Sequence, residues 1–415
     1  MTPPSGFSPF SNMASSTSTI LILNLPPKTF IGIDLLSFTA GGNFHGVINL
    51  PAGIHFLFTG TDPSLAIRHG QWLQAGPTPQ PYVFRWSTEI ESLELLRSDA
   101  DIAHSAVRSI RDLRNPGLVD YMALQDASAD LQSKQNEIEG NALPQPPSSD
   151  FGDWASLTSF ISSSLLSRVL SPGWTISSIS SAPADTESIP GLTHLETSSA
   201  LHQSTLNLVP INLKQTWLDS DVGRARTDKA RDRSWYLGHL IDGLSPSGDR
   251  QRGAAEFLGE LQFCFLMVLT LANYSCLEQW KRILGVLFRC QSALKEVEGY
   301  FVEVVKVLRL QLGHVEDVDG GLFDLKDESS SAWLRQLLSK FRGSADDILG
   351  EKNKLKDELT ELEDFMRDRY GWQRDKDIVR RGMLELEDGE KIEVSMDGLD
   401  EEEETGDYAP VVVDM

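Results

Sequence analysis

The stretch AAEFLGELQFCFLMVLTLAN, Ala254 to Asn273, is apolar on nearly every side when it is placed on a helix. A helix of this kind lies at the centre of a domain or crosses a membrane. Its most apolar part, FCFLMVLTLA at Phe263 to Ala272, has about half the length that a bilayer requires. The stretch therefore predicts the buried core helix of a helical domain and no membrane span.

Further helical patterns flank this core helix. Apolar residues recur at three- and four-residue steps, which places them on one face of a helix. One expected helix begins near residue 234, and the others cover residues 277–294, 300–312, 331–341 and 346–370. The apolar series of the last helix spans too few heptads for a coiled coil, so packing against its own domain is favoured. An α-helical domain is predicted over residues 210–384.

The N-terminal part has the pattern of a β domain. Short β-branched or aromatic runs are separated by Gly and Pro turns, at residues 20–25, 44–50, 54–59, 66–73 and 82–86. Strands at this spacing are typical of a sandwich or barrel. A charged helix is expected at Ser98 to Arg114. We assign residues 19–140 to a β-rich domain with a following helix, preceded by a disordered leader at residues 1–18.

A Pro- and Ser-rich linker is expected between the two domains, at residues 141–209. It contains a short predicted helix, Trp154 to Leu170, and then Ser171 to Ser204, which lacks periodicity and indicates a mobile loop. The predicted fold class is therefore α+β multidomain. A β-rich, sandwich-like N-terminal domain precedes an all-α domain and a disordered acidic C-terminal tail at residues 385–415.

Charge limits the partners that the protein can have. The 60 acidic and 37 basic residues give a net charge of −23. Such a chain repels phosphate backbones, so no direct contact with nucleic acid is expected. Residues 385–415 hold about thirteen acidic residues and the single base Lys391, which is roughly half of the net charge. A basic protein surface is the natural partner.

Catalytic and metal-binding patterns are missing from the sequence. Cys264, Cys276 and Cys290 have spacings that fit no zinc or redox motif, so they are expected to be buried, reduced thiols. His45 and His55 lie in strand-like runs and are interpreted as structural. No phosphate-binding loop, calcium loop, protease signature or kinase signature is found. We expect no enzyme activity and no cofactor, and the N-terminus is not a secretory signal.

Several stretches resemble one family, the a1-cistron splicing factors or Aar-two family. The N-terminal stretches are ILILNLPPKTFIGID (Ile20–Asp34), FHGVINLPAGIHFLF (Phe44–Phe58), FRWST (Phe84–Thr88) and WASLTSFIS (Trp154–Ser162). The most specific is LGELQFCFLMVLTLANYSCLEQWKRILGVLFRCQSAL, Leu258 to Leu294, and FMRDRYGW and APVVV follow it in the same order. The leader, residues 171–204 and the acidic stretch before APVVV match nothing in the family.

The resemblance implies a β-rich domain joined to a helical domain of VHS-like arrangement. It also implies a non-enzymatic assembly chaperone of the U5 small nuclear ribonucleoprotein in pre-mRNA splicing, present in cytoplasm and nucleus. Such a chaperone binds the large Prp-eight scaffold through its RNase-H-like and Jab-one/MPN-like domains. While bound it blocks premature docking of the Brr-two helicase, and phosphorylation favours its release.

Residues 407–415 read DYAPVVVDM, a β-prone tip directly after the acidic run Glu401 to Glu404. An extended tip can add an edge strand to a sheet of a partner, with Val411 and Val413 on one face and Val412 on the other. The predicted partner-binding residues are Tyr408, Ala409, Pro410, Val411, Val412 and Val413. The alternative is that the tip folds back on its own β domain.

Two further questions stay open at the level of sequence. A phosphorylation switch has candidate sites in Ser171 to Ser204 and at Ser329, Ser330 and Ser331, where new negative charge beside acidic residues of the docked surface would release the partner. The alternative function is an acidic adaptor or histone-chaperone-like buffer for basic proteins, and a hydrolase is the third. Binding led by charge alone would be lost at moderate salt.

Overall fold

The structure is a computed structural model of the whole chain. It describes residues 17–62, 67–78, 80–96, 117–124, 150–170, 172–187, 206–245, 247–315, 328–372, 381–385 and 391–395. The chain divides into two compact units, Met1–Gly152 and Asp153–Met415. The expected helix at Ser98 to Arg114, most of the leader and the tail tip Tyr408 to Val413 lie outside the described residues.

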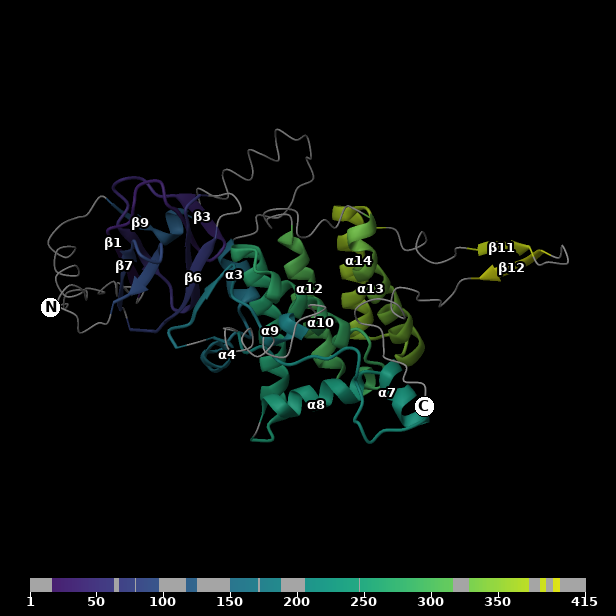
Figure 1. Cartoon of the computed structure of the whole chain (residues 1–415). Coiled ribbons are helices and arrows are strands. Elements are labelled where there is room, and N and C mark those ends of the chain that lie inside the picture. Colours follow the sequence, from purple (N-terminus) through teal and green to yellow (C-terminus); the bar gives the residue numbers. More distant parts are fainter. Residues whose placement is uncertain are drawn as a thin grey trace, which may run out of the picture. The chain divides into compact units, whose positions relative to one another are not determined.

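The first unit is built from two β-sheets (Figure 1). Its strands are β1 Ser18–Leu23, β2 Phe30–Ile33, β3 Leu36–Thr39, β4 Gly46–Leu50, β5 Gly53–Gly60, β6 Arg68–Ala75, β7 Pro81–Ser87, β8 Ser92–Leu95 and β9 Leu118–Asp120. One sheet has the order β8-β7-β1-β4-β9, and β6, β5, β2 and β3 are neighbours in the other. β1 is parallel to β7 and antiparallel to β4. The predicted β-rich, sandwich-like domain is thereby confirmed.

Strand β1 shows why the two sheets form. Successive side chains of a strand point to opposite faces. Ile20 and Ile22 join a core cluster that also contains Ile31 of β2 and residues of β5 and β6, so one face of β1 packs against the second sheet. Leu21 packs with Val83 on the other face. The run ILIL is therefore a strand that is buried on both faces.

The second unit is mainly helical (Figure 1). Its elements are α3 Asp150–Leu157, α4 Ser163–Val169, β10 Thr175–Ser177, α5 Pro183–Glu187, α7 Arg224–Arg231, α8 Ser234–Leu244, α9 Arg250–Leu271, α10 Tyr274–Leu287, α11 Ala293–Glu296, α12 Glu298–Gly313, α13 Glu328–Ile348 and α14 Lys354–Tyr370. Helices α8, α10 and α12 pack against α9. The expected helical domain with a central core helix is confirmed.

Helix α9 is the centre of this unit. Asp249 accepts hydrogen bonds from the backbone N–H groups of Gln251 and Arg252 at its first turn, and the helix ends at Ala272 in the left-handed conformation. Among the described residues, α9 has the length and hydropathy of a membrane span, but 83% of that apolar window is buried inside the unit. The core helix of a soluble protein has this character, as the sequence predicted.

The segment predicted as a linker, residues 141–209, holds more structure than its composition indicated. Helices α3 and α4, strand β10 and helix α5 all lie within it. Arg168 on α4 forms ion pairs of 2.8 Å with both Glu256 and Glu260 of α9. The side-chain amide of Asn273 donates to the backbone carbonyls of Ser177 and Ser180. Part of the expected mobile loop is thus held against the core by polar groups that periodicity does not reveal.

Two C-terminal elements also differ from expectation. The helix expected at residues 346–370 is split, because α13 continues to Ile348 and Asn353 caps a new helix by accepting from the backbone N–H groups of Leu355 and Lys356. The apolar face of α14 is buried within its own unit. In the acidic tail, β11 Arg381–Glu385 and β12 Lys391–Ser395 pair antiparallel.

A buried polar cluster lies inside the β unit. The Asp34 carboxylate accepts the Tyr121 hydroxyl at 2.5 Å and the Phe56 backbone N–H at 2.8 Å. His55 Nδ1 lies 2.7 Å from Asp34 and its Nε2 lies 3.0 Å from the Pro51 carbonyl. The Pro51 carbonyl and an ionised Asp34 are both acceptors, so the geometry favours a proton on each ring nitrogen of His55. The buried histidine is structural, as predicted, and its surroundings favour the imidazolium form.

This geometry makes the β unit sensitive to alkaline pH. Burial by itself lowers the pKa of His55, but the charge of Asp34 and the hydrogen bonds to Asp34 and Pro51 raise it above 6.5. A raised folded pKa contributes stability that is complete below about pH 6.5 and is lost as pH rises through the folded pKa. We expect His55→Gln to remove this pH-dependent part, measured by thermal unfolding from pH 6 to 9. The exposed His45 provides the control, since His45→Gln should keep the wild-type change of melting temperature with pH. If the melting temperature changes equally with pH in the wild type and both variants, His55 is not the source of the alkaline sensitivity.

Candidate functional site

A groove of about 890 Å³ opens on the helical unit. One wall is α8, the second is the first half of α9, and the third is α11 with the start of α12. The described residues that line it combine apolar side chains with a larger number of acidic than basic groups. A concave surface of this size and composition is suited to bind a segment of another protein.

Two glycines give the groove its open walls. Gly238 lies in α8 and Gly299 lies in the first turn of α12. A Cβ atom added to either residue would meet no atom within 4 Å. Glycine in a helix interior costs about 1 kcal/mol relative to alanine. These positions therefore leave space at the surface, and nothing in their own packing requires glycine.

The apolar part of the groove includes residues that water can reach. Val297, between α11 and α12, is 46% exposed. Ala254 and Ala255 of α9 and Ile241 of α8 also line the groove, and their small or partly covered side chains keep the floor shallow. Apolar side chains left in this position gain free energy when a partner covers them.

Charged residues surround this apolar floor. Asp242 of α8 and Arg250 of α9 form a two-pronged ion pair across the groove, with both N–O distances at 2.7 Å. Glu296 and Glu303 line the α11–α12 side. Because carboxylates outnumber basic groups along the lining, the groove favours a partner segment that carries lysine or arginine beside an apolar anchor.

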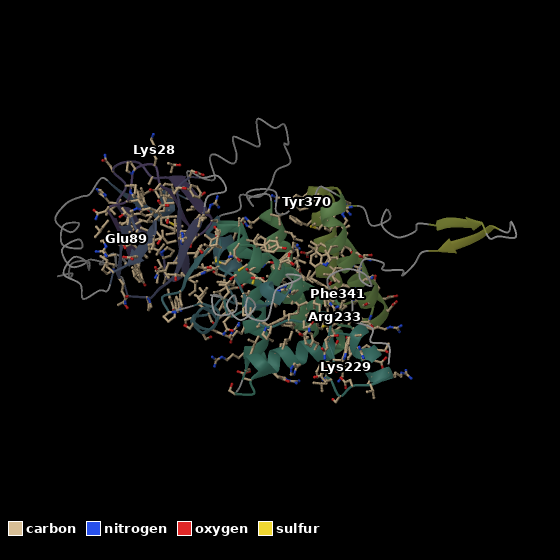
Figure 2. The ribbon with its side chains drawn as sticks, viewed as in Figure 1. Lys28, Glu89, Lys229, Arg233, Phe341 and Tyr370 are labelled. Atoms are coloured by element: carbon tan, nitrogen blue, oxygen red, sulfur yellow. The ribbon has the colours of Figure 1, made fainter. Side chains whose placement is uncertain are left out.

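An aromatic and basic stack forms the α7–α8 end of the groove. The rings of Trp235 and His239 are stacked, with their centroids 5.3 Å apart and their planes 8° from parallel. Lys229 of α7 places its ammonium 4.1 Å from the centre of the Trp235 ring, and Figure 2 labels this lysine on the surface of the unit. Cation–π contacts of this kind hold the flexible lysine side chain in place.

Asp232 connects this end of the groove to the α10–α11 loop. Its carboxylate accepts hydrogen bonds from the Ser234 hydroxyl, from the backbone N–H groups of Gln291 and Ser292, and from the Ser292 hydroxyl. Burial by itself raises the pKa of Asp232, but these hydrogen bonds lower it below 3.8. The carboxylate is therefore ionised at neutral pH and sets the distance between α8 and α11.

Sequence reasoning had placed the site elsewhere. The predicted partner-binding residues Tyr408 to Val413 lie outside the described residues, so the structure does not bring them to the groove. Of the serines considered for phosphorylation, Ser331 is fully buried. Cys264, Cys276 and Cys290 are buried free thiols, as predicted. Within the described part of the chain, no cluster of three or more His, Cys, Asp or Glu residues could hold a metal ion.

Sequence patterns did not predict the groove, because no pattern within a single helix indicates it. Its walls come from residues about sixty positions apart, and Asp232 is one acidic residue among many. The one available signal was Gly238 inside an expected helix, since a mid-helix glycine commonly has a packing or functional reason.

Asp232 should be essential for the shape of the groove. We expect Asp232→Ala to lower the free energy of unfolding at pH 7 by roughly 2 to 4 kcal/mol, because several charge-assisted hydrogen bonds are lost together. Urea unfolding followed by circular dichroism measures this change. Ser292→Ala, which removes only one of the donors, should cost about 1 kcal/mol. Equal and small losses in the two variants would show that Asp232 is not the link between the helices.

Comparisons with known proteins agree with both units. A family model described as the AAR2 N-terminal domain matches residues 16–171, and one described as the AAR2 C-terminal repeat region matches residues 208–375. "Protein AAR2 homolog" of Homo sapiens is 26% identical over 333 residues, which is 72% of this chain and 76% of that protein. The protein of the same name from Pongo abelii is 27% identical over 331 residues, with the same coverage.

A more distant relative extends the match along the chain. "Protein AAR2 homolog" of Caenorhabditis elegans is 20% identical over 369 residues, which cover 85% of this chain and 93% of the relative. Together the two family models span most of the described β unit and nearly all of the described helices. The chain belongs to the AAR2 family.

Proposed function

We propose that this protein is a non-enzymatic assembly chaperone of the U5 small nuclear ribonucleoprotein. In this role it binds the large Prp-eight scaffold in the cytoplasm, holds the scaffold's RNase-H-like and Jab-one/MPN-like domains, and keeps the Brr-two helicase from docking before assembly is complete. The observation that carries the proposal is the family match across both units, at residues 16–171 and 208–375. Phosphorylation that adds negative charge at a docked surface favours release of the scaffold.

The geometry of the helical unit supports this role over a purely electrostatic one. A scaffold that later binds RNA presents basic surfaces, and an acidic chaperone with a net charge of −23 is suited to cover them. The groove adds shape to this charge, since it places an apolar floor between α8, α9 and α12 inside an acidic rim. We assign the groove to a basic, partly apolar segment of the scaffold.

The tail provides a second contact in this proposal. Ala409 to Val413 adds an edge strand to a sheet of the scaffold, with main-chain hydrogen bonds as the main source of affinity. Pro410 has no N–H group, so it lies at the start of the added strand or on its outer side. A strand this short binds weakly alone, but its link to a docked body gives it a high effective concentration.

Filling the groove provides a direct test. Gly238→Leu places a side chain in open space, so the protein should fold and gain up to about 1 kcal/mol of stability from better helix propensity. The same side chain occupies the groove, and we expect the dissociation constant for the scaffold's two domains to rise at least about tenfold. Calorimetric titration of the purified domains measures it.

The matched control lies in the same helix. Gly243 of α8 also has no atom within 4 Å of an added Cβ, but it does not line the groove. Gly243→Leu should therefore bind the scaffold as the wild type does. If both variants bind normally while moderate salt abolishes binding, the protein acts as a charge-led buffer for basic proteins and the groove has no part in it.

The tail tip is tested separately. Deletion of Tyr408 to Met415 should weaken scaffold binding and leave thermal unfolding unchanged, because we expect the tip to pair with the partner's sheet in the complex and to add little stability to the free protein. Val412→Pro should have much of the same effect, since it removes a backbone donor from the added strand, whereas Val412→Ile should be neutral. A lower melting temperature combined with normal binding would instead place the tip on its own β domain.

A further inference from the structure

Helix α7 is a basic surface on an acidic protein. Its sequence, RARTDKAR at Arg224 to Arg231, carries four basic residues and one acidic residue, and none of its residues is buried. The helix thus has a local positive charge, while the chain as a whole has a net charge of −23. Positive charge concentrated on one exposed element attracts an acidic partner.

Two of the three arginines of α7, Arg224 and Arg231, have few charged neighbours within the described residues. Arg224 lies 3.7 Å from Asp228, and both side chains are largely exposed, at 94% and 66%. An exposed ion pair of this kind contributes little. For Arg231, which is also exposed, the described part of the chain offers no ion pair. Both guanidinium groups can therefore accept a carboxylate partner with little competition.

Apolar and aromatic groups lie directly beside this charge. The Arg226 guanidinium stacks 4.6 Å from the centre of the Trp217 ring. Leu218 is 45% exposed and Val222 is 75% exposed, although both are large aliphatic side chains. Arg224 and Arg231 are seven residues apart and lie on one side of α7 together with Asp228, whereas Arg226 lies on the side that faces Trp217. We use the name α7 face for the exposed surface around the helix that is formed by Trp217, Leu218, Val222, Arg224, Arg226 and Arg231. It combines basic groups with apolar side chains that a partner would cover.

We propose that the α7 face is the intramolecular docking site of the acidic tail, with Glu401 to Glu404 on its arginines and the tip that follows on its apolar residues. The tail has the matching chemistry, because an acidic run is followed within a few residues by Tyr408 and Val411 to Val413. The proposal rests on the proposed function, since it assigns a resting place to the segment that is to bind the scaffold.

The tail is also able to reach the face. Helix α14 ends at Tyr370, and residues 373–380 and 396–400 connect it to Glu401 on either side of the β11–β12 hairpin. An extended chain spans about 3.3 Å per residue, so these connections alone extend roughly 40 Å. A unit of this size has a radius of gyration of about 17 Å. The tether then gives the tail an effective concentration near the millimolar range.

A tethered acidic segment fits this face better than nucleic acid does. The chain as a whole has an acidic net charge, which disfavours a polyanion that extends beyond the eight residues of α7. The four carboxylates of Glu401 to Glu404 span about the length of α7, so they place little negative charge outside this helix. Aliphatic residues after the run cover Leu218 and Val222, whereas RNA would leave them exposed to water.

The contact regulates access to the scaffold. Asp228 and Lys229 of α7 also line the groove, so a tail docked on α7 lies beside the groove's basic and aromatic end. A basic segment of the scaffold that approaches the groove competes for the tail's carboxylates and frees the tip. By linkage, partner binding and tail docking weaken each other by the same factor.

Tail docking can be measured on the full-length protein alone. The three native cysteines are buried, so Met415→Cys creates the one readily accessible thiol in the described and tail residues. A small thiol-reactive fluorophore that tryptophan quenches on contact reports proximity to Trp217. We expect strong quenching at low salt that largely disappears near 1 M salt, where the Debye length falls to about 3 Å. Trp217→Phe should reduce it in the same way.

Charge reversal identifies the face. Arg224→Glu with Arg231→Glu should remove most of the quenching, and Gln in place of Glu401 to Glu404 should do the same from the other side of the contact. Lys352→Glu with Lys354→Glu reverses two exposed charges outside α7 and should leave the quenching intact. Unchanged circular dichroism shows that each variant is folded, which is expected because α7 has no buried residues.

The outcomes separate this proposal from the proposed function. If the wild type shows no quenching at low salt, or if reversal on α7 and reversal at the control sites act equally, the tail does not dock on α7. If a single-stranded RNA oligonucleotide binds the face while the tail label stays unquenched, the face is a nucleic-acid site and the proposal is wrong. None of these measurements uses the scaffold, so their results do not depend on whether the protein binds the scaffold.

Discussion

The Glu260 carboxylate lies fully buried in the middle of α9. The packing of neighbouring segments of the helical unit depends on the groups that donate hydrogen bonds to it. Arg168 of α4 donates at 2.8 Å, and the Val209 backbone and the Gln279 amide donate to the other oxygen at 2.9 and 2.8 Å. A buried charge that loses one such partner costs several kcal/mol. This constraint holds residues 163–170 and 206–211 against the core and so supports the back of the α8–α9 groove.

The helical unit has two surfaces of opposite charge, the acidic groove and the basic helix α7. Acidic residues surround an apolar groove, and α7 at one end of it carries four basic residues and one acidic residue. If the protein protects a basic scaffold, as we propose, the first surface serves recognition, and the proposed docking of the acidic tail uses the second. Charge alone would attract many basic proteins, and specificity then comes from the shape that Gly238 and Gly299 leave open.

Much of the fold could be predicted because the strongest patterns are local. The run ILIL is a buried strand, and Ala254 to Asn273 is a core helix, since each is a nearly continuous apolar run whose length separates a short buried strand from a long buried helix. Within residues 153–187 a single helix over Trp154 to Leu170 was predicted, but its division into α3 and α4 and the packing of the whole segment could not be predicted in this way. The stability of this segment depends on hydrogen bonds to Glu256, Gln262 and Asn273, which are distant in sequence and have no periodic signal.

The sequence by itself determined the order of the two units, the identity of the central helix, the excess of negative charge and the resemblance to the family. These properties depend on composition, on spacing within one element and on the order of motifs. Only the tertiary structure formed the groove that we propose as a partner site, because α8 and α12 must both pack against α9 to enclose it. It also raised the pKa of His55, because folding brings the acceptors of Asp34 and Pro51 to its two ring nitrogens.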